Sequence, residues 1–106
     1  MSKLKGYHRK YLRGIAHALK PVVLIGQKGL TAEVLRSTET ALDYHELIKV
    51  KFIEFKEKDR KAAILDRLEM ETGCEKVGII GHTAILYRQQ KDPEKRKISL
   101  PNKKKV

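Results

Sequence analysis

The sequence is poor in the residues that build disulfide frameworks, membrane spans and aromatic ligand platforms. Its 106 residues include one cysteine, no tryptophan, two phenylalanines and three prolines. The lone Cys74 allows no disulfide framework and no zinc site made of thiolates. No apolar run approaches the roughly 20 residues of a membrane span, and the first residues lack the apolar segment of a signal peptide. We therefore expect a cytoplasmic protein with no membrane contact.

Size and hydrophobic content point to one folded domain. Apolar residues make up 41% of the chain, which is ordinary for a globular protein and too much for a disordered one. A chain of this length can bury one core, but it is too short for two domains.

The charge is large and unevenly distributed. The formal net charge is +11. Residues 1–32 contain seven Lys or Arg and no acid, residues 33–75 contain eight against eleven acids, and residues 76–106 contain nine against two. Self-repulsion of this size opposes a compact state, so it usually serves a polyanionic partner. Because the excess lies at the two ends of the sequence, the charge indicates a binding footprint.

The hydrophobic pattern predicts three helices and four strands, in the order α-β-α-β-α-β-β. The helices are expected over residues 4–19, 32–44 and 59–72, and the strands over 22–25, 47–55, 77–80 and 84–87. Thr31 and Asp59 are candidate N-caps, and Gly73 a candidate C-terminal residue. The expected fold class is α/β: a compact two-layer domain with a four-stranded mixed sheet, mostly parallel, closed by one antiparallel hairpin. We assign residues 1–90 to this domain and residues 91–106 to a basic, disordered tail.

The first predicted helix has one face of a single charge sign. Lys5, Arg9 and Arg13 follow one another at i, i+4 and i+8, and Lys10 lies on their flank. Like charges at this spacing repel and cost a few tenths of a kcal/mol per pair. A solvated helix face more often mixes the two signs, so this pattern favours nucleic acid over a bland surface.

A G-x-x-G sequence, Gly26 to Gly29, separates the first strand from the second helix. Glycines allow positive φ and a close approach of the backbone to a ligand, and the helix behind them offers unpaired N–H groups to a phosphate. Lys28 adds a cation. The pattern alone also fits a tight turn. A P-loop and a dinucleotide fingerprint are excluded, because Leu30 follows the second glycine and residue 32 is Ala.

Several longer segments resemble the CRM domain, an RNA-binding module also called the YhbY family. The resemblance covers about residues 3–89. It is carried by Leu12-Arg13, Ala16, Leu19-Lys20-Pro21, Ile25 to Thr31, Ala41-Leu42, His45 to Val50, Gly73, Val77 to His82 and Leu86-Tyr87-Arg88. The family fold is similar to the C-terminal domain of bacterial translation initiation factor three. Single-domain bacterial members are associated with precursors of the large ribosomal subunit, and plant organellar members promote group II intron splicing.

The resemblance implies an RNA-binding protein in which the G-x-x-G loop contacts RNA. With the basic pattern, it gives these candidate RNA-binding residues: Lys5, Arg9, Lys10, Arg13, Lys20, Gly26, Gln27, Lys28, Gly29, Lys49 and Lys51. The expected partner is ribosomal RNA of the large-subunit precursor, bound through its backbone by a monomer. The alternatives are a protein-docking or structural module on the ribosome and a splicing cofactor for group II introns.

No residue pattern favours catalysis, a metal or a cofactor. The four histidines have no second ligand at a useful spacing, and Cys74 lacks a helix N-terminus that would activate it. The acids of the third helix alternate with bases, as on an ordinary exposed face. Phe52 and Tyr11 are expected in the core. Few aromatic residues remain to stack on bases, so we expect recognition of backbone and shape.

Overall fold

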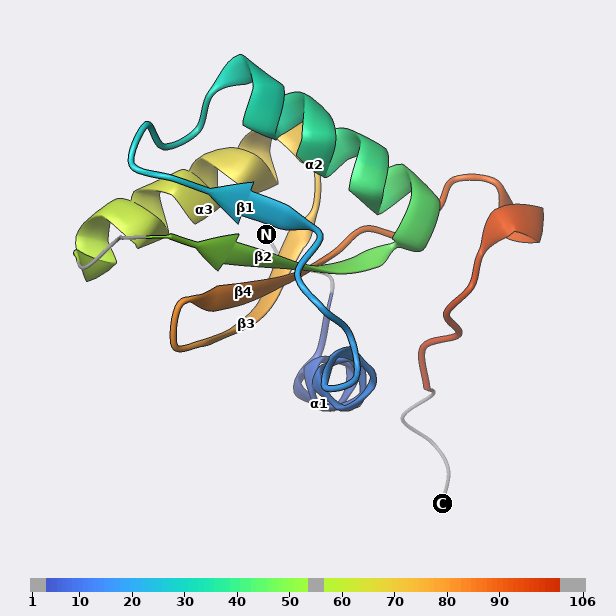
Figure 1. Ribbon diagram of the computed structural model, residues 1–106. Coiled ribbons are helices and arrows are strands. Elements are labelled where there is room, and N and C mark those ends of the chain that lie inside the picture. Colours follow the sequence, from blue (N-terminus) through green and yellow to red (C-terminus); the bar gives the residue numbers. More distant parts are fainter. Residues whose placement is uncertain (1–3, 54–56, 102–106) are drawn as a thin grey trace.

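The computed structural model describes residues 4–53 and 57–101. Its elements follow the predicted order (Figure 1): α1 Gly6–Ala16, β1 Val23–Ile25, α2 Ala32–His45, β2 Leu47–Phe52, α3 Lys58–Thr72, β3 Glu75–Ile80, β4 Thr83–Tyr87 and the short 3-10 helix η1 Pro93–Lys95. The predicted fold class, α/β with three helices and a four-stranded mixed sheet, is confirmed.

The sheet contains less parallel pairing than the alternation of helices and strands suggested. The strand order is β1-β2-β4-β3. The pair β1/β2 is parallel, whereas β2/β4 and β4/β3 are antiparallel. The reason is that α3 carries the chain past the centre to an outer strand, β3, and the tight hairpin then brings β4 back between β2 and β3.

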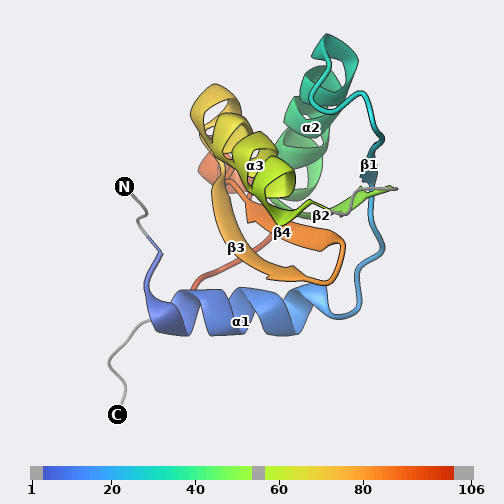
Figure 2. The ribbon, with the colours of Figure 1, turned by 90° about the vertical axis from the view of Figure 1, so that its left-hand side faces the viewer.

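Helices cover both faces of the sheet, so the domain has three layers and not the predicted two (Figures 1 and 2). Helices α2 and α3 pack on one face over Val50, Phe52 and Leu86, among others. Helix α1 packs on the other face over Ile85 and Tyr87. Strand β4 has buried side chains on both faces, because every residue from Ala84 to Tyr87 is apolar.

The ends of the elements agree with some of the predicted signals. Thr31 caps α2, since its side chain accepts a 3.1 Å hydrogen bond from the Val34 N–H. Gly73 ends α3 in the left-handed conformation at φ 76°. Asp59 is not a cap, because α3 begins one residue earlier, after Glu57. Strand β2 ends at Phe52, and part of its predicted extension, residues 54 and 55, lies outside the described residues.

Helix α1 ends at Ala16, three residues before the predicted end, and the chain turns toward β1. Leu12 and Ala16 are fully buried against the sheet. Tyr11, which was expected in the core, is instead 42% exposed, because it lies on the flank of the helix. Phe52 is buried as predicted.

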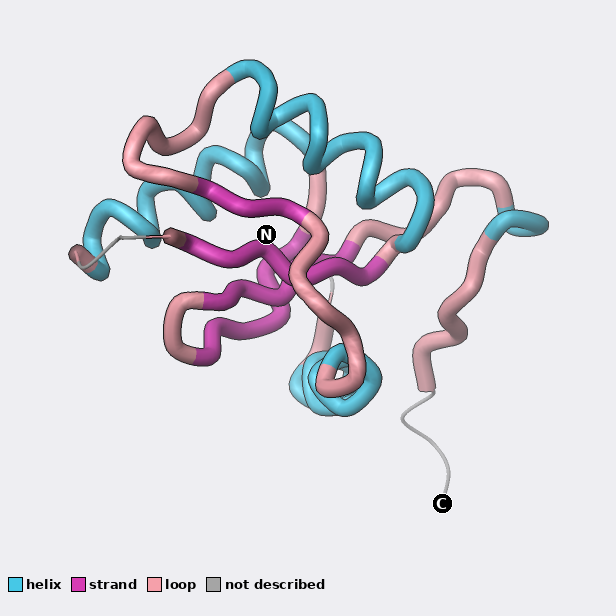
Figure 3. The backbone as a smooth tube through the Cα atoms, in the orientation of Figure 1, coloured by secondary structure: helices cyan, strands magenta, loops and turns pink. Residues whose placement is uncertain are grey.

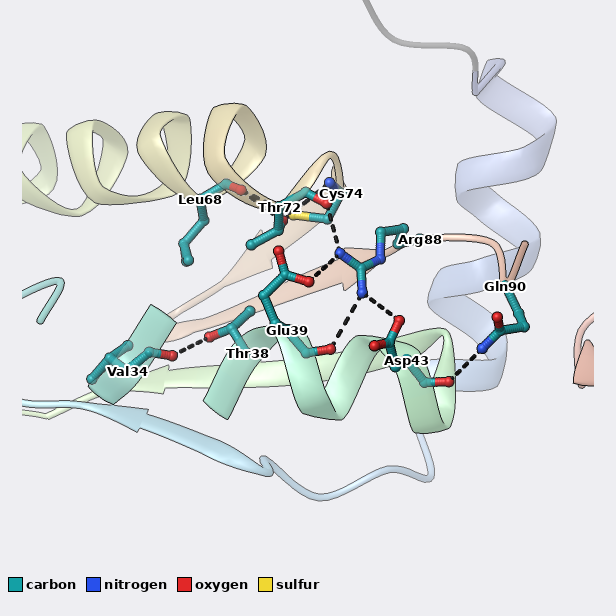
Figure 4. Close-up of polar contacts among 9 residues, drawn as sticks. All are labelled: Val34, Thr38, Glu39, Asp43, Leu68, Thr72, Cys74, Arg88 and Gln90. Atoms are coloured by element: carbon teal, nitrogen blue, oxygen red, sulfur yellow. Dashed lines mark hydrogen bonds and ion pairs between the residues drawn. The ribbon is translucent and has the colours of Figure 1, made fainter. Parts of the chain in front are cut away.

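Arg88, just after β4, joins the two helices of one layer (Figure 4). Its Nη1 donates 2.7 Å hydrogen bonds to Oε1 of Glu39 on α2 and to the carbonyl oxygen of Thr72 at the end of α3. Its Nη2 donates to the Glu39 carbonyl at 3.3 Å and to Oδ1 of Asp43 at 2.8 Å. The guanidinium therefore satisfies a helix-terminal carbonyl and pairs with two acids.

Residues 91–101 belong to the C-terminal segment that we expected to be a disordered tail. The segment passes through η1, and Ile98 and Leu100 then pack against the core under α1. Backbone N–H groups of Lys97 and Ile98 donate to the buried carboxylate of Glu46. The expected tail residues 102–106 lie outside the described residues. The expectation of disorder came from composition, because Ile98 and Leu100 are scattered among the seven basic residues of the segment 91–106.

Candidate nucleic-acid interface

The G-x-x-G loop is a tight turn that links the end of β1 to the start of α2. The Gly29 N–H donates a 2.9 Å hydrogen bond to the Gly26 carbonyl, which closes the turn. Gly29 has φ 76°, a conformation that favours glycine, whereas Gly26 does not have positive φ. Only the second glycine is therefore required by the backbone. The side chains of Gln27 and Lys28 are exposed.

Helix α3 supports this loop with a residue that the sequence did not single out. Arg60 donates from Nη2 to the Gln27 carbonyl oxygen. A Cβ at Gly29 would lie 3.5 Å from the same Nη2 atom, so the guanidinium lies directly beside the turn. Arg60 was missed because α3 alternates acids and bases, a pattern typical of a solvated helix. The guanidinium adds a second cation beside Lys28.

The loop and the first turn of α2 enclose a hollow of about 550 Å³. Its lining includes Gly26, Lys28 and Arg36, together with one acid, Glu33. The N-terminus of α2 has backbone N–H groups that favour an anion, although Thr31 already occupies the N–H of Val34. Lys28, Arg36 and Arg60 provide cations around the loop. Such a combination can hold a phosphate group.

The basic residues of α1 do not all point in one direction. Arg13 lies on the sheet, since a Cβ added at Gly78 of β3 would be 3.3 Å from its Cδ atom. Arg9 turns back and donates a 2.9 Å hydrogen bond from Nη1 to the Leu4 carbonyl. Lys5 and Lys10 are exposed. Glycine at position 78 lets the stem of Arg13 pack against the strand.

The three remaining candidates lie at or beside the sheet. Lys49 is half-buried, and its Nζ donates a 3.0 Å hydrogen bond to the carbonyl of Leu19, which anchors the α1–β1 connection. Lys51, two residues further along β2, is exposed on the same face, and Lys20 is exposed in the connection. Lys49 thus has a structural partner, whereas the ammonium groups of Lys20 and Lys51 face solvent.

The loop residues and Lys51 lie at one end of the sheet, whereas Lys5 lies near the other end, because the N–H of Leu4 donates a 3.2 Å hydrogen bond to Glu75 at the start of β3. The G-x-x-G loop, the start of α3 and the β3–β4 turn gather at the first of these ends, and α1 crosses the strands on the opposite face from α2 and α3 (Figures 1 and 2). Loop and α1 therefore lie on different sides of the sheet. A ligand that contacts both has to pass around the ends of β1 and β2, close to Lys51.

A polar pair at this end was also missed. Lys61 of α3 is buried apart from 9% of its surface, and its Nζ lies 3.1 Å from Nδ1 of His82 in the β3–β4 turn. The His82 carbonyl accepts a 2.8 Å hydrogen bond from the Phe52 N–H. The pair joins the hairpin to α3, so His82 has a structural role next to the candidate interface.

The elements around α1 contain few acids. Within their described bounds, α1, β1, β2 and β4 contain no Asp or Glu, and the acid of β3, Glu75, lies at the start of α1, where it accepts a hydrogen bond from the Leu4 N–H. A phosphate chain would meet little repulsion there, and its neutralisation would release counterions.

Within residues 4–53 and 57–101, the structure gives little support for a reactive cysteine, a metal site or a membrane-spanning helix. Burial raises the pKa of the Cys74 thiol above its ordinary value, so the reactive thiolate is disfavoured. Those residues contain no group of three or more His, Cys, Asp or Glu side chains arranged to hold a metal ion. Over the same residues, no helix has the length and apolarity to cross a bilayer.

The fold and the loop define a small α/β domain with a basic G-x-x-G end, and sequence comparison identifies its family. The profile of the CRS1 / YhbY (CRM) domain matches residues 4–88. The chain is 42% identical over 103 residues to an RNA-binding protein of Haemophilus influenzae, covering 97% of this chain and all of that protein. It is 33% identical to "Probable RNA-binding protein YqeI" of Bacillus subtilis, covering 92% of this chain and 99% of the relative.

A solved structure agrees with this assignment. The solution structure of protein SAV1595 of Staphylococcus aureus superposes with a TM-score of 0.76 at 31% sequence identity, covering 92% of this chain and 99% of that one. The chain belongs to the CRS1 / YhbY (CRM) domain family, as its sequence motifs predicted.

Proposed function

We propose that this chain is an RNA-binding protein, without catalytic activity of its own, that holds the backbone of structured RNA. Two relatives that cover nearly the whole chain are named "RNA-binding protein" and "Probable RNA-binding protein YqeI". The observation that carries the proposal is the G-x-x-G loop, which Arg60 contacts at one end of the sheet, together with the exposed Lys51 of β2 at the same end and the acid-free helix α1 on the adjoining face. A basic surface that borders a phosphate-sized turn suits a polyanion.

In this proposal the loop and the basic helix have separate tasks. The loop positions one phosphate with its backbone and with Lys28, and Arg60 holds the loop through the Gln27 carbonyl. Neighbouring phosphates are attracted by Lys5 at the N-cap of α1, by Arg9, Lys10 and Arg13 within this helix, and by Lys20 and Lys51. Lys49 acts indirectly, because it fixes the α1–β1 connection through Leu19. Backbone contacts of this kind give affinity and orientation but little sequence selectivity.

The finer proposal is that the RNA belongs to precursors of the large ribosomal subunit, which the chain binds as a cytoplasmic monomer. The support is the family match over residues 4–88 and the resemblance to bacterial members that are associated with these precursors. A splicing role in group II introns is the alternative within the same class.

Salt dependence tests the loop. Each phosphate contact that is lost lowers the slope of log affinity against log salt by about one. Lys28→Ala is therefore expected to weaken binding to a ribosomal RNA fragment and to flatten the slope by about one. Lys95→Ala is the matched control, because η1 lies at the opposite end of the molecule (Figure 1). Equal slopes for Lys28→Ala and the wild type would remove the loop from the site.

Cross-linking in cell extract, with sequencing of the bound RNA across a sucrose gradient, tests the target. Reads on large-subunit ribosomal RNA in fractions lighter than the mature subunit would support an assembly role. Reads concentrated on introns would replace that role with splicing. No enrichment of RNA would mean that the basic end binds a protein, which is the docking alternative.

A further inference from the structure

One row of residues crosses all four strands at the end of the sheet, on the face that α1 covers. Leu24 of β1 is in register with Lys51 of β2, Lys51 with Thr83 of β4, and Thr83 with Ile80 of β3. We call these four residues the open row. Paired residues in neighbouring strands point to the same face, so the four side chains form one strip, about 14 Å across at the usual strand spacing.

Helix α1 leaves the open row uncovered. The next row on the same face contains Lys49, Ile85 and Gly78, where Ile85 is buried and Arg13 packs over Gly78. In the open row itself, Leu24 is 56% exposed and Ile80 is 65% exposed. Figure 1 shows the same arrangement, because the strands extend beyond α1, which is viewed along its axis. Two large aliphatic side chains thus face solvent beside the candidate interface.

The charge around the open row selects the kind of partner. Lys51 lies within the row and Arg13 and Lys49 beside it, and the described bounds of α1, β1, β2 and β4 contain no acid. The partner is therefore anionic. It must also offer apolar surface, because Leu24 and Ile80 gain nothing from phosphate groups.

A nucleic acid meets both conditions where its bases are unpaired. In an A-form duplex, the faces of the bases are stacked inside and the surface presents phosphates and hydroxyls. An unpaired nucleotide presents the face of its base and the carbon edge of its ribose to an apolar side chain, and its phosphate to a lysine. The open row offers both kinds of contact, because aliphatic residues lie at its two ends and the polar residues Lys51 and Thr83 lie between them.

We propose that the open row binds the bases and riboses of an unpaired segment of RNA, while the G-x-x-G loop and α1 hold the flanking backbone. This inference rests on the proposed function and deepens it, since it specifies structured RNA that has a single-stranded extension or bulge. The row contains no aromatic side chain, so the contact selects unpaired over paired RNA and discriminates weakly among bases.

The test compares the two faces of the sheet. Leu24→Thr and Ile80→Thr, combined, shorten the exposed aliphatic groups and place threonine, a β-branched residue that suits a strand, at both positions. Ile79→Thr is the matched control, because Ile79 is 47% exposed on the opposite face, paired with Ala84. The probes are an RNA hairpin with an oligouridine tail and the same hairpin without the tail. Fluorescence anisotropy gives the affinities over a salt series, and thermal unfolding checks the fold.

For the tailed hairpin, the double variant is expected to lose affinity about three- to tenfold, the range for losing part of two apolar contacts. Its salt slope and its affinity for the tailless hairpin should stay unchanged, and Ile79→Thr should behave as the wild type. A double variant that folds and binds the tailed hairpin like the wild type overturns the proposal, and so does an equal loss on both probes. If the wild type binds neither hairpin, RNA binding itself fails, which the wild-type titration shows separately.

Discussion

Oε1 of Glu46 accepts a 2.7 Å hydrogen bond from the backbone N–H of Lys97. The same oxygen accepts from Ile98 at 3.0 Å, and Oε2 accepts from the N–H of Gln90 at 2.7 Å. Glu46 is 1% exposed and has φ 67°, an uncommon value for a residue other than glycine. One buried acid between α2 and β2 thus fixes the C-terminal segment, which places Ile98 and Leu100 against the core under α1.

Glu46→Ala is expected to lower the free energy of unfolding by about 2–4 kcal/mol, because it removes the charged acceptor of three backbone N–H groups. Urea denaturation measures the loss. Limited proteolysis should also cut the segment after Arg88 sooner in the variant. Glu46→Gln is the control, since it keeps one carbonyl oxygen and should lose less. A free energy within about 0.5 kcal/mol of the wild type for Glu46→Ala would contradict the anchoring role.

Arg88→Met is expected to destabilise the protein by about 1–2 kcal/mol, mainly because the Thr72 and Glu39 carbonyls lose a charged donor. The comparison is Asp43→Asn. This change removes only the ion pair between Arg88 and the Asp43 side chain, which is 71% exposed, so the loss of stability should stay below about 0.5 kcal/mol. Denaturation at low and high salt separates the two contributions. If the Arg88→Met loss vanished in high salt, surface charge and not carbonyl satisfaction would explain it.

Local signals predicted most of the fold because they act within a few residues. Thr31 at the start of α2 and Gly73 at the end of α3 have side-chain or backbone properties that fix helix ends. The layer count depends instead on long-range packing. Nothing near Leu12 in the sequence indicates that it packs in one core cluster with Ile85, on the face of the sheet that α1 covers. The position of β4 between β2 and β3 is likewise a property of the whole chain.

The parts of the candidate site that form a motif in the sequence were predictable, whereas the parts that depend on tertiary contacts were not. The G-x-x-G loop and the basic helix stand out in the sequence. Arg60 joins the loop only through folding, because 33 residues separate it from Gln27. The open row is a consequence of register, since its four residues come from four strands. In the sequence, Leu24 and Ile80 read as core residues within short apolar runs.

The two loop glycines are expected to respond differently to alanine. Gly29→Ala forces a left-handed φ on a residue with a Cβ, which costs about 1 kcal/mol or more. Gly26 has no positive φ, and no heavy atom lies within 4 Å of an added Cβ, so Gly26→Ala should fold like the wild type. If the loop backbone approaches a phosphate, Gly26→Ala nevertheless weakens RNA binding.

The measurement pairs thermal unfolding with RNA titration for both glycine variants. A Gly26→Ala protein with unchanged stability and lowered affinity would separate binding from folding at this turn. Unchanged affinity would mean that the backbone at Gly26 stays away from the RNA, and the loop would then act through Lys28 alone.

The ionisation of Tyr87 is expected to lower the stability of the fold at alkaline pH. Burial, and secondarily the charge of Glu46, raise the pKa of its phenol above the ordinary value. Its buried hydroxyl has no hydrogen-bond partner among the described residues. Above pH about 10 the unfolded chain loses this proton while the folded chain retains it. The contribution of Tyr87 is therefore complete below pH 10, and it is lost as the pH rises through the higher pKa of the folded state.

Tyr87→Phe removes both the titration and the unpaired hydroxyl. At pH 7 the variant should equal the wild type or exceed it by up to about 1 kcal/mol in the free energy of unfolding. Above pH 10 its advantage should grow, by at most about 1.4 kcal/mol per pH unit. Urea denaturation from neutral to alkaline pH measures the difference, with Tyr11→Phe, a change at an exposed phenol, as the control. Parallel curves for Tyr87→Phe and the wild type would show that the hydroxyl ionises as readily in the folded protein as in the unfolded chain.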